Sequence, residues 1–296
     1  MQERQIARLV TLPPLRQGFV GPGHLMTPVI DGSDFARTDP FIMLADDHLD
    51  IGERPVGGAH PHAGFETVTL LLEGAIHDRD EGGTIDTGEV QWMTAGSGVI
   101  HGENVEARGR VRLLQLWLTL PRQHRWTTPG FQDLHAPEIP LVREGAVTVR
   151  VYSGESGGRR APTRNHVPVT IIEAVLPPRS RYAQLLPSSY NGFVMPIDGQ
   201  IEVDGTVVDT GAVGWLSRPM GHEGSRVTLR TGDTAARVVL YAGEPQGDAI
   251  VSHGPFIGDT RDDITQRYAE FRRGEFPRMS ELARAKKGQA QAQAIV

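Results

Sequence analysis

Short apolar runs separated by glycine and proline are the main pattern of this 296-residue chain. Val, Ile, Leu and Thr dominate these runs, and apolar residues at helical spacing are rare. The runs expected to form strands are Thr67–Leu72, Val111–Leu120, Val147–Tyr152, Val169–Val175, Val227–Leu229 and Ala236–Ala242. Short strands with frequent turn signals are typical of β-sandwiches and β-barrels. The pattern therefore predicts an all-β fold.

One helix is expected, close to the end of the chain. Asp259 or Thr260 can cap its N-terminus, and Gly274 is a typical signal for its end. The apolar residues at helical spacing are Ile264, Tyr268 and Phe271. The last stretch, Glu281–Val296, has no strong apolar face. We therefore predict a short C-terminal helix and tail over residues 259–296.

The pattern Asp-Thr-Gly-x-Val-x-Trp occurs twice, at Asp86–Trp92 and at Asp209–Trp215. Two similar hairpins can arise independently, but five identities in seven positions favour a duplicated β domain. We expect a first domain over residues 1–135 and a second over residues 136–258. The stretch Pro121–Pro140 contains four prolines and few strand-forming residues, and it is the expected linker.

Cysteine is absent from the chain, which excludes disulfides, thiolate metal sites and cysteine nucleophiles. Any bound metal must therefore be held by nitrogen and oxygen atoms. The formal net charge of −6 argues against direct nucleic-acid binding, which favours a basic surface. No apolar run has the length of a signal-peptide core or of a membrane span. These features predict a cytoplasmic protein without membrane association, and we expect a monomer.

Two pairs of metal-ligand residues flank the first copy of the repeat. His60 and His62 are separated by Pro61, which favours an extended backbone at His60. His101 and Glu103 have the same spacing, and residues i and i+2 of a strand point to one face. On adjacent strands the two pairs would bring three imidazoles and a carboxylate together. That set suits a first-row divalent metal such as iron, manganese, nickel, copper or zinc.

Each of these histidines taken singly is better explained as a half-exposed loop residue. The pairing, in a glycine-rich strand context on both sides of the repeat, is what favours a metal site. No His-x-His pair precedes the second copy of the repeat. The second domain is therefore expected to lack a metal site.

The stretches His60–Gly74 (HPHAGFETVTLLLEG) and Gly88–Glu103 (GEVQWMTAGSGVIHGE) resemble the pirin family of the cupin superfamily. Shorter matches follow at Leu113–Pro121, Phe131–Leu134 and His253–Ile257. The resemblance implies an all-β fold of two tandem cupin β-barrels of the jelly-roll type, followed by a short helix. This agrees with the repeat.

The ligand set that the resemblance implies is His60, His62, His101 and Glu103. These residues are expected to hold one metal, usually Fe(II), with another divalent first-row metal as the alternative. Glu66 has the spacing of a ligand in many cupins but is not a ligand in pirins. It is expected to support the site or the strand.

Candidate walls of a substrate pocket are Phe65, Trp92 and Met93. Leu116 and Leu118 are also candidates, but ordinary barrel core explains them better. An enclosed apolar pocket large enough for a fused-ring phenol would favour catalysis over regulation.

The resemblance implies two classes of function. Some bacterial pirins are quercetin 2,3-dioxygenases, which open the ring of a flavonol with O2, and Glu103 would then also accept the proton of the substrate hydroxyl. Other pirins are non-catalytic iron-binding proteins that bind transcription regulators or metabolic enzymes in a metal-dependent way. A third interpretation is a storage-like or structural cupin whose site is unused. The partners are accordingly a small phenolic substrate with O2, or a regulatory protein.

Overall fold

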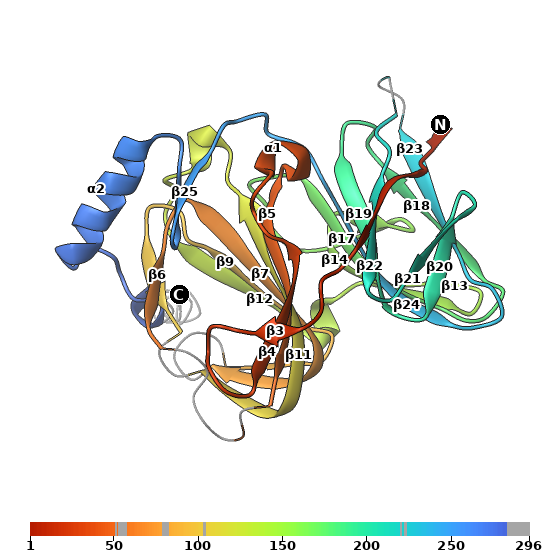
Figure 1. Ribbon diagram of the computed structural model, residues 1–296, viewed down its shortest axis with the longest axis horizontal. Helices are drawn as coiled ribbons and strands as arrows, with labels where there is room; N and C mark the ends of the chain where they lie inside the picture. The colour runs from red at the N-terminus through yellow and green to blue at the C-terminus, as the bar shows by residue number, and fades with distance from the viewer. Residues whose placement is uncertain are drawn as a thin grey trace, which may run out of the picture. The chain divides into compact units, whose positions relative to one another are not determined.

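The structure is a computed structural model that describes residues 1–50, 52, 58–78, 83–102, 105–219, 221 and 224–282. These residues form two compact units. The first-barrel unit comprises the described residues of 15–36, 41–135 and 248–296, and the second-barrel unit comprises those of 1–14, 37–40 and 136–247. Strands make up most of both units, which confirms the predicted all-β fold of two barrels (Figure 1).

The first-barrel unit is built on one large antiparallel sheet with the strand order β12-β9-β7-β11-β5-β4-β3, in which β8 pairs with β7. Two smaller sheets, β6 with β10 and β25 with β26, complete it. The strands are β3 (Arg16–Gln17), β4 (His24–Ile30), β5 (Phe41–Leu49), β6 (His60–His62), β7 (Phe65–Asp78), β8 (Gly83–Asp86), β9 (Val90–Thr94), β10 (Val99–His101), β11 (Val105–Thr119), β12 (Gly130–Leu134), β25 (Val251–His253) and β26 (Phe256–Gly258). The predicted strand Thr67–Leu72 is part of β7, and the predicted strand Val111–Leu120 lies in β11 except for Leu120.

The second-barrel unit contains a seven-stranded sheet with the order β13-β14-β17-β24-β19-β22-β2. A second sheet has the order β1-β23-β20-β21, with β18 paired to β23, and β15 pairs with β16. The strands are β1 (Gln2–Glu3), β2 (Ile6–Thr11), β13 (Leu141–Glu144), β14 (Val147–Ser153), β15 (Glu155–Ser156), β16 (Arg159–Arg160), β17 (Val169–Leu176), β18 (Arg181–Leu186), β19 (Asn191–Asp198), β20 (Gln200–Val203), β21 (Thr206–Asp209), β22 (Ala212–Leu216), β23 (Ser225–Arg230) and β24 (Ala236–Gly243). The remaining four predicted strands are confirmed in β14, β17, β23 and β24.

The two copies of the repeat form the same local structure. In the first copy the hydroxyl of Thr87 donates to the carbonyl oxygen of Gly74 at 2.9 Å. In the second copy the hydroxyl of Thr210 donates to the carbonyl oxygen of Gly199 at 2.7 Å. The threonine of the motif thus makes the equivalent hydrogen bond in both barrels.

The interiors of the two barrels differ at the strand that ends each repeat. Gly214 in β22 stands where the first copy has Gln91 in β9. A Cβ atom at Gly214 would lie 2.7 Å from Ile6 and 2.9 Å from Val208, because apolar side chains fill this interior. The first barrel instead has polar and apolar side chains around a cavity at the equivalent position.

The N-terminal strand belongs to the second-barrel unit, although the predicted division places residues 1–135 together. Strand β2 pairs with β22, and the side chain of Arg4 is fully buried. Its guanidinium donates hydrogen bonds to Ser225 Oγ and to the carbonyl oxygens of Pro187, Ser188, Tyr190 and Ser217. Part of the expected linker is also structured, since β12 pairs with β9 in the sheet of the first barrel.

The predicted C-terminal helix is confirmed as α2 (Arg261–Arg272). Thr260 is its N-cap and forms a capping box with Asp263. Short helices in the described residues include α1 (Phe35–Thr38), η1 (Arg122–His124) and η2 (Ala136–Glu138). No helix in the described ranges is long and apolar enough to cross a membrane.

Candidate metal centre

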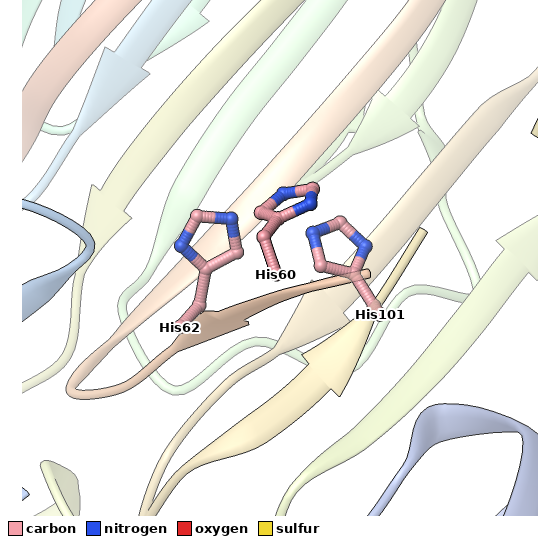
Figure 2. Close-up of side chains that lie close together, drawn as sticks. All are labelled: His60, His62 and His101. Carbon is pink, nitrogen blue, oxygen red and sulfur yellow. The ribbon is translucent and has the colours of Figure 1, made fainter. Parts of the chain in front are cut away.

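Three histidines converge on the pair of strands β6 and β10 (Figure 2). In the antiparallel register His101 lies opposite His60, and His62 follows two residues along β6 on the same face. One nitrogen from each ring lies within 4.8 Å of the others. The ring centroids of His60, His62 and His101 are 4.3–5.0 Å apart. Three imidazoles at this spacing form a possible donor set for a divalent metal.

The tautomer of His60 is fixed by its neighbour. The Nδ1 atom of His60 lies 2.8 Å from the carbonyl oxygen of Gly58. Because a carbonyl only accepts, Nδ1 carries the proton and Nε2 keeps its lone pair for a metal. Gly102 lies against the same ring, and a Cβ atom there would be 3.1 Å from His60 Cε1. The glycine next to His101 therefore leaves room for the imidazole of His60.

The two more enclosed histidines are held in the neutral form. Burial is the main cause that lowers the pKa of His62 to about 3, with a smaller contribution from the charge of His60. Burial, followed by the charges of His62 and His60, holds the pKa of His101 well below its usual range. Neutral imidazole is the form that binds metals. The buried Nδ1 of His62 has no hydrogen-bond partner within the described part of the chain, a cost that a ligand can relieve.

The C-terminal segment supports the histidine strands through backbone contacts. The N–H of Ile257 donates to the carbonyl oxygen of Ala63 at 3.0 Å, and Ala63 forms a bridge with Phe256. Gly64 has a φ of +88°, and a Cβ atom there would lie 1.9 Å from the carbonyl oxygen of Ile257. Only glycine fits this position. The sequence motif that contains Phe256 thus helps to fix the position of β6.

The buried Arg125 also links the C-terminal segment to the turn after His62. Arg125 is fully buried, and its Nε donates to Asp259 Oδ1 at 2.9 Å. Its Nη1 donates to the carbonyl oxygen of Gly64 at 3.1 Å. The ion pair therefore joins the start of the C-terminal helix to the turn that follows His62.

A cavity of about 400 Å³ lies inside the first barrel, and the three histidines are part of its wall. Most of the rest of the wall is apolar. Its large apolar members include Met26, Met43, Met93, Leu113 and Trp117. The ring of Trp117 meets the His62 ring edge-on at 5.3 Å between centroids. A volume and lining of this kind suit a small organic ligand.

Polar groups interrupt the apolar wall at a few positions. Thr69 donates to Gln115 Oε1 at 2.9 Å. His24 Nε2 lies 2.7 Å from Asp47 Oδ1, and both residues are buried. Phe19 lines the cavity although 84% of its surface is exposed, so the cavity reaches solvent beside it.

Comparisons with known proteins show to which family the chain belongs. The family model described as "Pirin" matches residues 26–118, and the "Pirin C-terminal cupin domain" matches residues 171–277. A "Pirin-like protein" of Caulobacter vibrioides is 34% identical over 285 residues, which cover 93% of this chain and 100% of that protein. This chain belongs to the pirin family. The pirin of Rattus norvegicus is 33% identical over 273 residues, covering 90% of this chain and 92% of the rat protein.

Solved structures give the same result. GK1651 from Geobacillus kaustophilus is 34% identical, with a TM-score of 0.76 over 84% of this chain and 100% of that one. Quercetin 2,3-dioxygenase from Acinetobacter baumannii is 26% identical, with a TM-score of 0.79 over 93% of this chain and 98% of that one. The predicted resemblance to pirins and the predicted fold of two cupin barrels are confirmed.

Some of the residues predicted for the site of this pirin line the cavity, and others do not. His60, His62 and His101 lie together on the cavity wall. Glu103, predicted as the fourth ligand and as the catalytic carboxylate, lies outside the described residues. Met93 lines the cavity. Phe65 and Trp92, the other two predicted wall residues, do not line the cavity.

Phe65 is fully buried against His62 and Trp117, with ring centroids 5.1 and 4.3 Å away. It thus packs behind the site and is not part of the cavity wall. Trp92 is buried on the face of β9 opposite to that of Met93, since successive residues of a strand alternate. Leu116 and Leu118 are fully buried in the same pirin barrel.

Glu66 lies on the outer face of β7 in this pirin, away from the cavity. Its Oε1 accepts a hydrogen bond from the Thr94 hydroxyl at 2.7 Å. Burial raises the pKa of Glu66 to about 7, and the hydrogen bond from Thr94 acts in the opposite direction. The carboxyl therefore supports the packing of β7 against β9.

Sequence reasoning did not identify Trp117, His24 and Asp47 as wall residues. The signal for Trp117 is present, because it alternates with Leu116 and Leu118 and shares a strand face with Gln115 and Leu113. For His24 and Asp47 the pairing depends on the register between β4 and β5, which no local motif shows.

Proposed function

We propose that this pirin is a metal-dependent dioxygenase that acts on flavonols such as quercetin, opening the ring with O2. The observation that carries the proposal is the convergence of three imidazoles on the wall of a largely apolar cavity of about 400 Å³. The likeness to a quercetin 2,3-dioxygenase over 93% of the chain supports it. The proposed substrates are a small phenol and O2.

The proposed ligands are His60, His62, His101 and Glu103, with Fe(II) as the proposed metal. The three imidazoles fit this role because they are close together and because His62 and His101 are held neutral. Glu103 is separated from His101 by one residue, the same spacing as in the His60 and His62 pair. A divalent metal bound here supplies a Lewis acid that orients the substrate oxygen atoms.

The chain's own residues account for the other requirements of the reaction. Trp117, Met43 and Met93 form an apolar wall that binds a planar aromatic body and excludes water around it. The hydrogen bond from His60 to Gly58 orients one ligand before any metal binds. Glu103 is proposed to accept the proton of the flavonol 3-hydroxyl when the substrate binds.

The test loads the full-length protein with Fe(II) without oxygen, removes unbound metal and then adds quercetin and O2. We expect loss of the flavonol absorbance together with O2 uptake. His62→Ala and Glu103→Gln should abolish both, and His124→Ala, which changes an exposed histidine outside the triad, should change neither.

Undiminished turnover in the His62→Ala and Glu103→Gln variants would refute the assignment to this site. Absence of turnover in a metal-loaded wild-type protein would refute the dioxygenase and leave the regulatory alternative, because both functions require the same metal centre. A pull-down with ferrous, ferric and metal-free protein then tests whether partner binding depends on the metal.

A further inference from the structure

The register of the strands divides the cavity wall into rows. The row beside the histidines consists of Met93, Thr67, Trp117 and Met43. The next row consists of Gln91, Thr69, Gln115 and Ala45, and the third consists of Leu113, Asp47 and Met26. Asp47 follows Met43 by four residues along β5, which is about 13 Å of strand. Asp47 and the Trp117 that contacts His62 therefore lie at different levels of the cavity.

Asp47 is held in place by His24. The backbone N–H of Val20 donates to His24 Nδ1 at 3.2 Å, so this nitrogen is unprotonated and Nε2 carries the hydrogen. Nε2 then donates to Asp47 Oδ1 at 2.7 Å. The His24 ring is fixed further by Gly18, where a Cβ atom would lie 2.3 Å from the ring, and by the edge of Phe19 at 5.4 Å.

This bond leaves one carboxylate oxygen available for a ligand. Within the described ranges Asp47 Oδ2 takes part in no hydrogen bond, and the side chain keeps 10% of its exposure. The residue lines the cavity. Because His24 has used both ring nitrogens, it cannot donate to Oδ2 as well. Oδ2 is thus a pure acceptor that an incoming hydrogen-bond donor can satisfy.

The row between Asp47 and the histidines adds a second polar position. Gln91 faces the cavity, and its Nε2 atom is buried without a hydrogen-bond partner in the described part of the chain. A buried amide N–H without a partner is costly, so a ligand oxygen at this level would be favoured. The wall therefore offers an acceptor at one level and a donor at the next.

We infer that Asp47, oriented by His24, is the residue by which this cavity selects aromatic substrates that carry a phenolic hydroxyl remote from the metal end. The inference rests on the proposed function for the position of the reacting end of the substrate. The apolar rows fit the aromatic body, and the carboxylate accepts the hydroxyl proton in a charge-assisted hydrogen bond. Asp47 is a specificity-determining residue, and His24 is a positioning residue.

The experiment compares two flavonols by calorimetry. Quercetin carries hydroxyls on both of its outer rings, and 3-hydroxyflavone keeps only the 3-hydroxyl. In Asp47→Asn the amide oxygen still accepts from His24, but an NH2 group replaces the free acceptor, so the fold is preserved and the contact is lost. We expect the variant to weaken quercetin binding about tenfold and to change the Kd of 3-hydroxyflavone less than about twofold. His24→Phe should also weaken quercetin binding, and thermal unfolding checks that both variants are folded.

The matched control is Glu66→Gln, the same kind of change at a buried carboxyl on the outer face of β7, and neither Kd should change. An equal loss for both flavonols in Asp47→Asn, or no loss for quercetin, would overturn the inference. Each Kd is measured with Fe(II)-loaded protein without oxygen and again with metal-free protein. If Asp47→Asn weakens only quercetin binding in metal-free protein, but the wild type shows no turnover after loading with Fe(II), the proposed function alone is contradicted. Turnover without selectivity would contradict this inference alone.

Discussion

His101 lies directly opposite His60 in the antiparallel pair of β10 and β6, with their ring centroids 4.3 Å apart. The register between β6 and β10 creates the donor set, because it brings His101 next to the His60 and His62 pair. A shift by one residue would turn one histidine to the other face of the pair. The centre therefore depends on what holds β6 and β10 in place.

Removal of one imidazole should prevent stoichiometric metal binding. In His101→Ala we expect the affinity for Fe(II) to fall by more than the roughly tenfold to hundredfold that loss of a supporting residue costs a metal site. Elemental analysis after dialysis against a weak chelator measures the metal bound per chain. His124→Ala serves as the control and should keep the wild-type content. Full metal content in His101→Ala would contradict the assignment of the triad.

Gly64 should tolerate no side chain. Gly64→Ala places a Cβ atom 1.9 Å from the Ile257 carbonyl oxygen at a φ of +88°, so we expect at least about 3 kcal/mol of lost stability. Denaturant unfolding measures this loss, and metal content should fall with it because the same turn follows His62. Gly58→Ala is the matched control, since nothing lies within 4 Å of a Cβ atom there. Equal stability of the two variants would show that the C-terminal segment does not constrain β6.

The pairing of His60 with His62 was predictable because the spacing of the two residues is local. A His-x-His pair in an extended segment places both rings on one face, whatever the rest of the fold does. The opposition of His60 and His101 required the register of two strands far apart in sequence, which the family resemblance supplied and periodicity did not.

The cavity wall was harder to predict for a physical reason. Alternation separates Trp92 from Met93 but does not say which of them faces inward, because the strand is buried on both faces. The His24–Asp47 contact is less visible still. His24 lies opposite Leu49 in the pairing of β4 and β5, so the contact with Asp47 is diagonal and depends on side-chain direction.

Arg4 should stabilise the second-barrel unit far more than its position near the chain start indicates. Arg4→Met leaves four backbone carbonyls and Ser225 without their donor, so we expect a loss of about 3–5 kcal/mol in the free energy of unfolding. Arg8→Met is the control, because Arg8 is only partly buried and its guanidinium lies over the Trp215 ring, and it should cost less than about 1 kcal/mol. Similar unfolding midpoints for the two variants would contradict the role of Arg4.

Glu66 should make stability depend on pH. Its pKa is raised from 4.5 to about 7 in the folded protein, mainly by burial, so the native state binds this proton more tightly than the unfolded chain does. The contribution is fully present below about pH 4.5 and is lost as the pH rises through about 7, with a total of about 3 kcal/mol. Glu66→Gln removes this dependence. We therefore expect the variant to be more stable than wild type at about pH 8, by up to about 3 kcal/mol, and about equal to it at about pH 5.

Denaturant unfolding at both pH values measures the difference. Glu73→Gln, an exposed change on the same strand, should follow the wild type at both. A Glu66→Gln variant that is less stable than wild type at about pH 8 would show that the carboxylate is stabilised by its hydrogen bonds more than burial destabilises it.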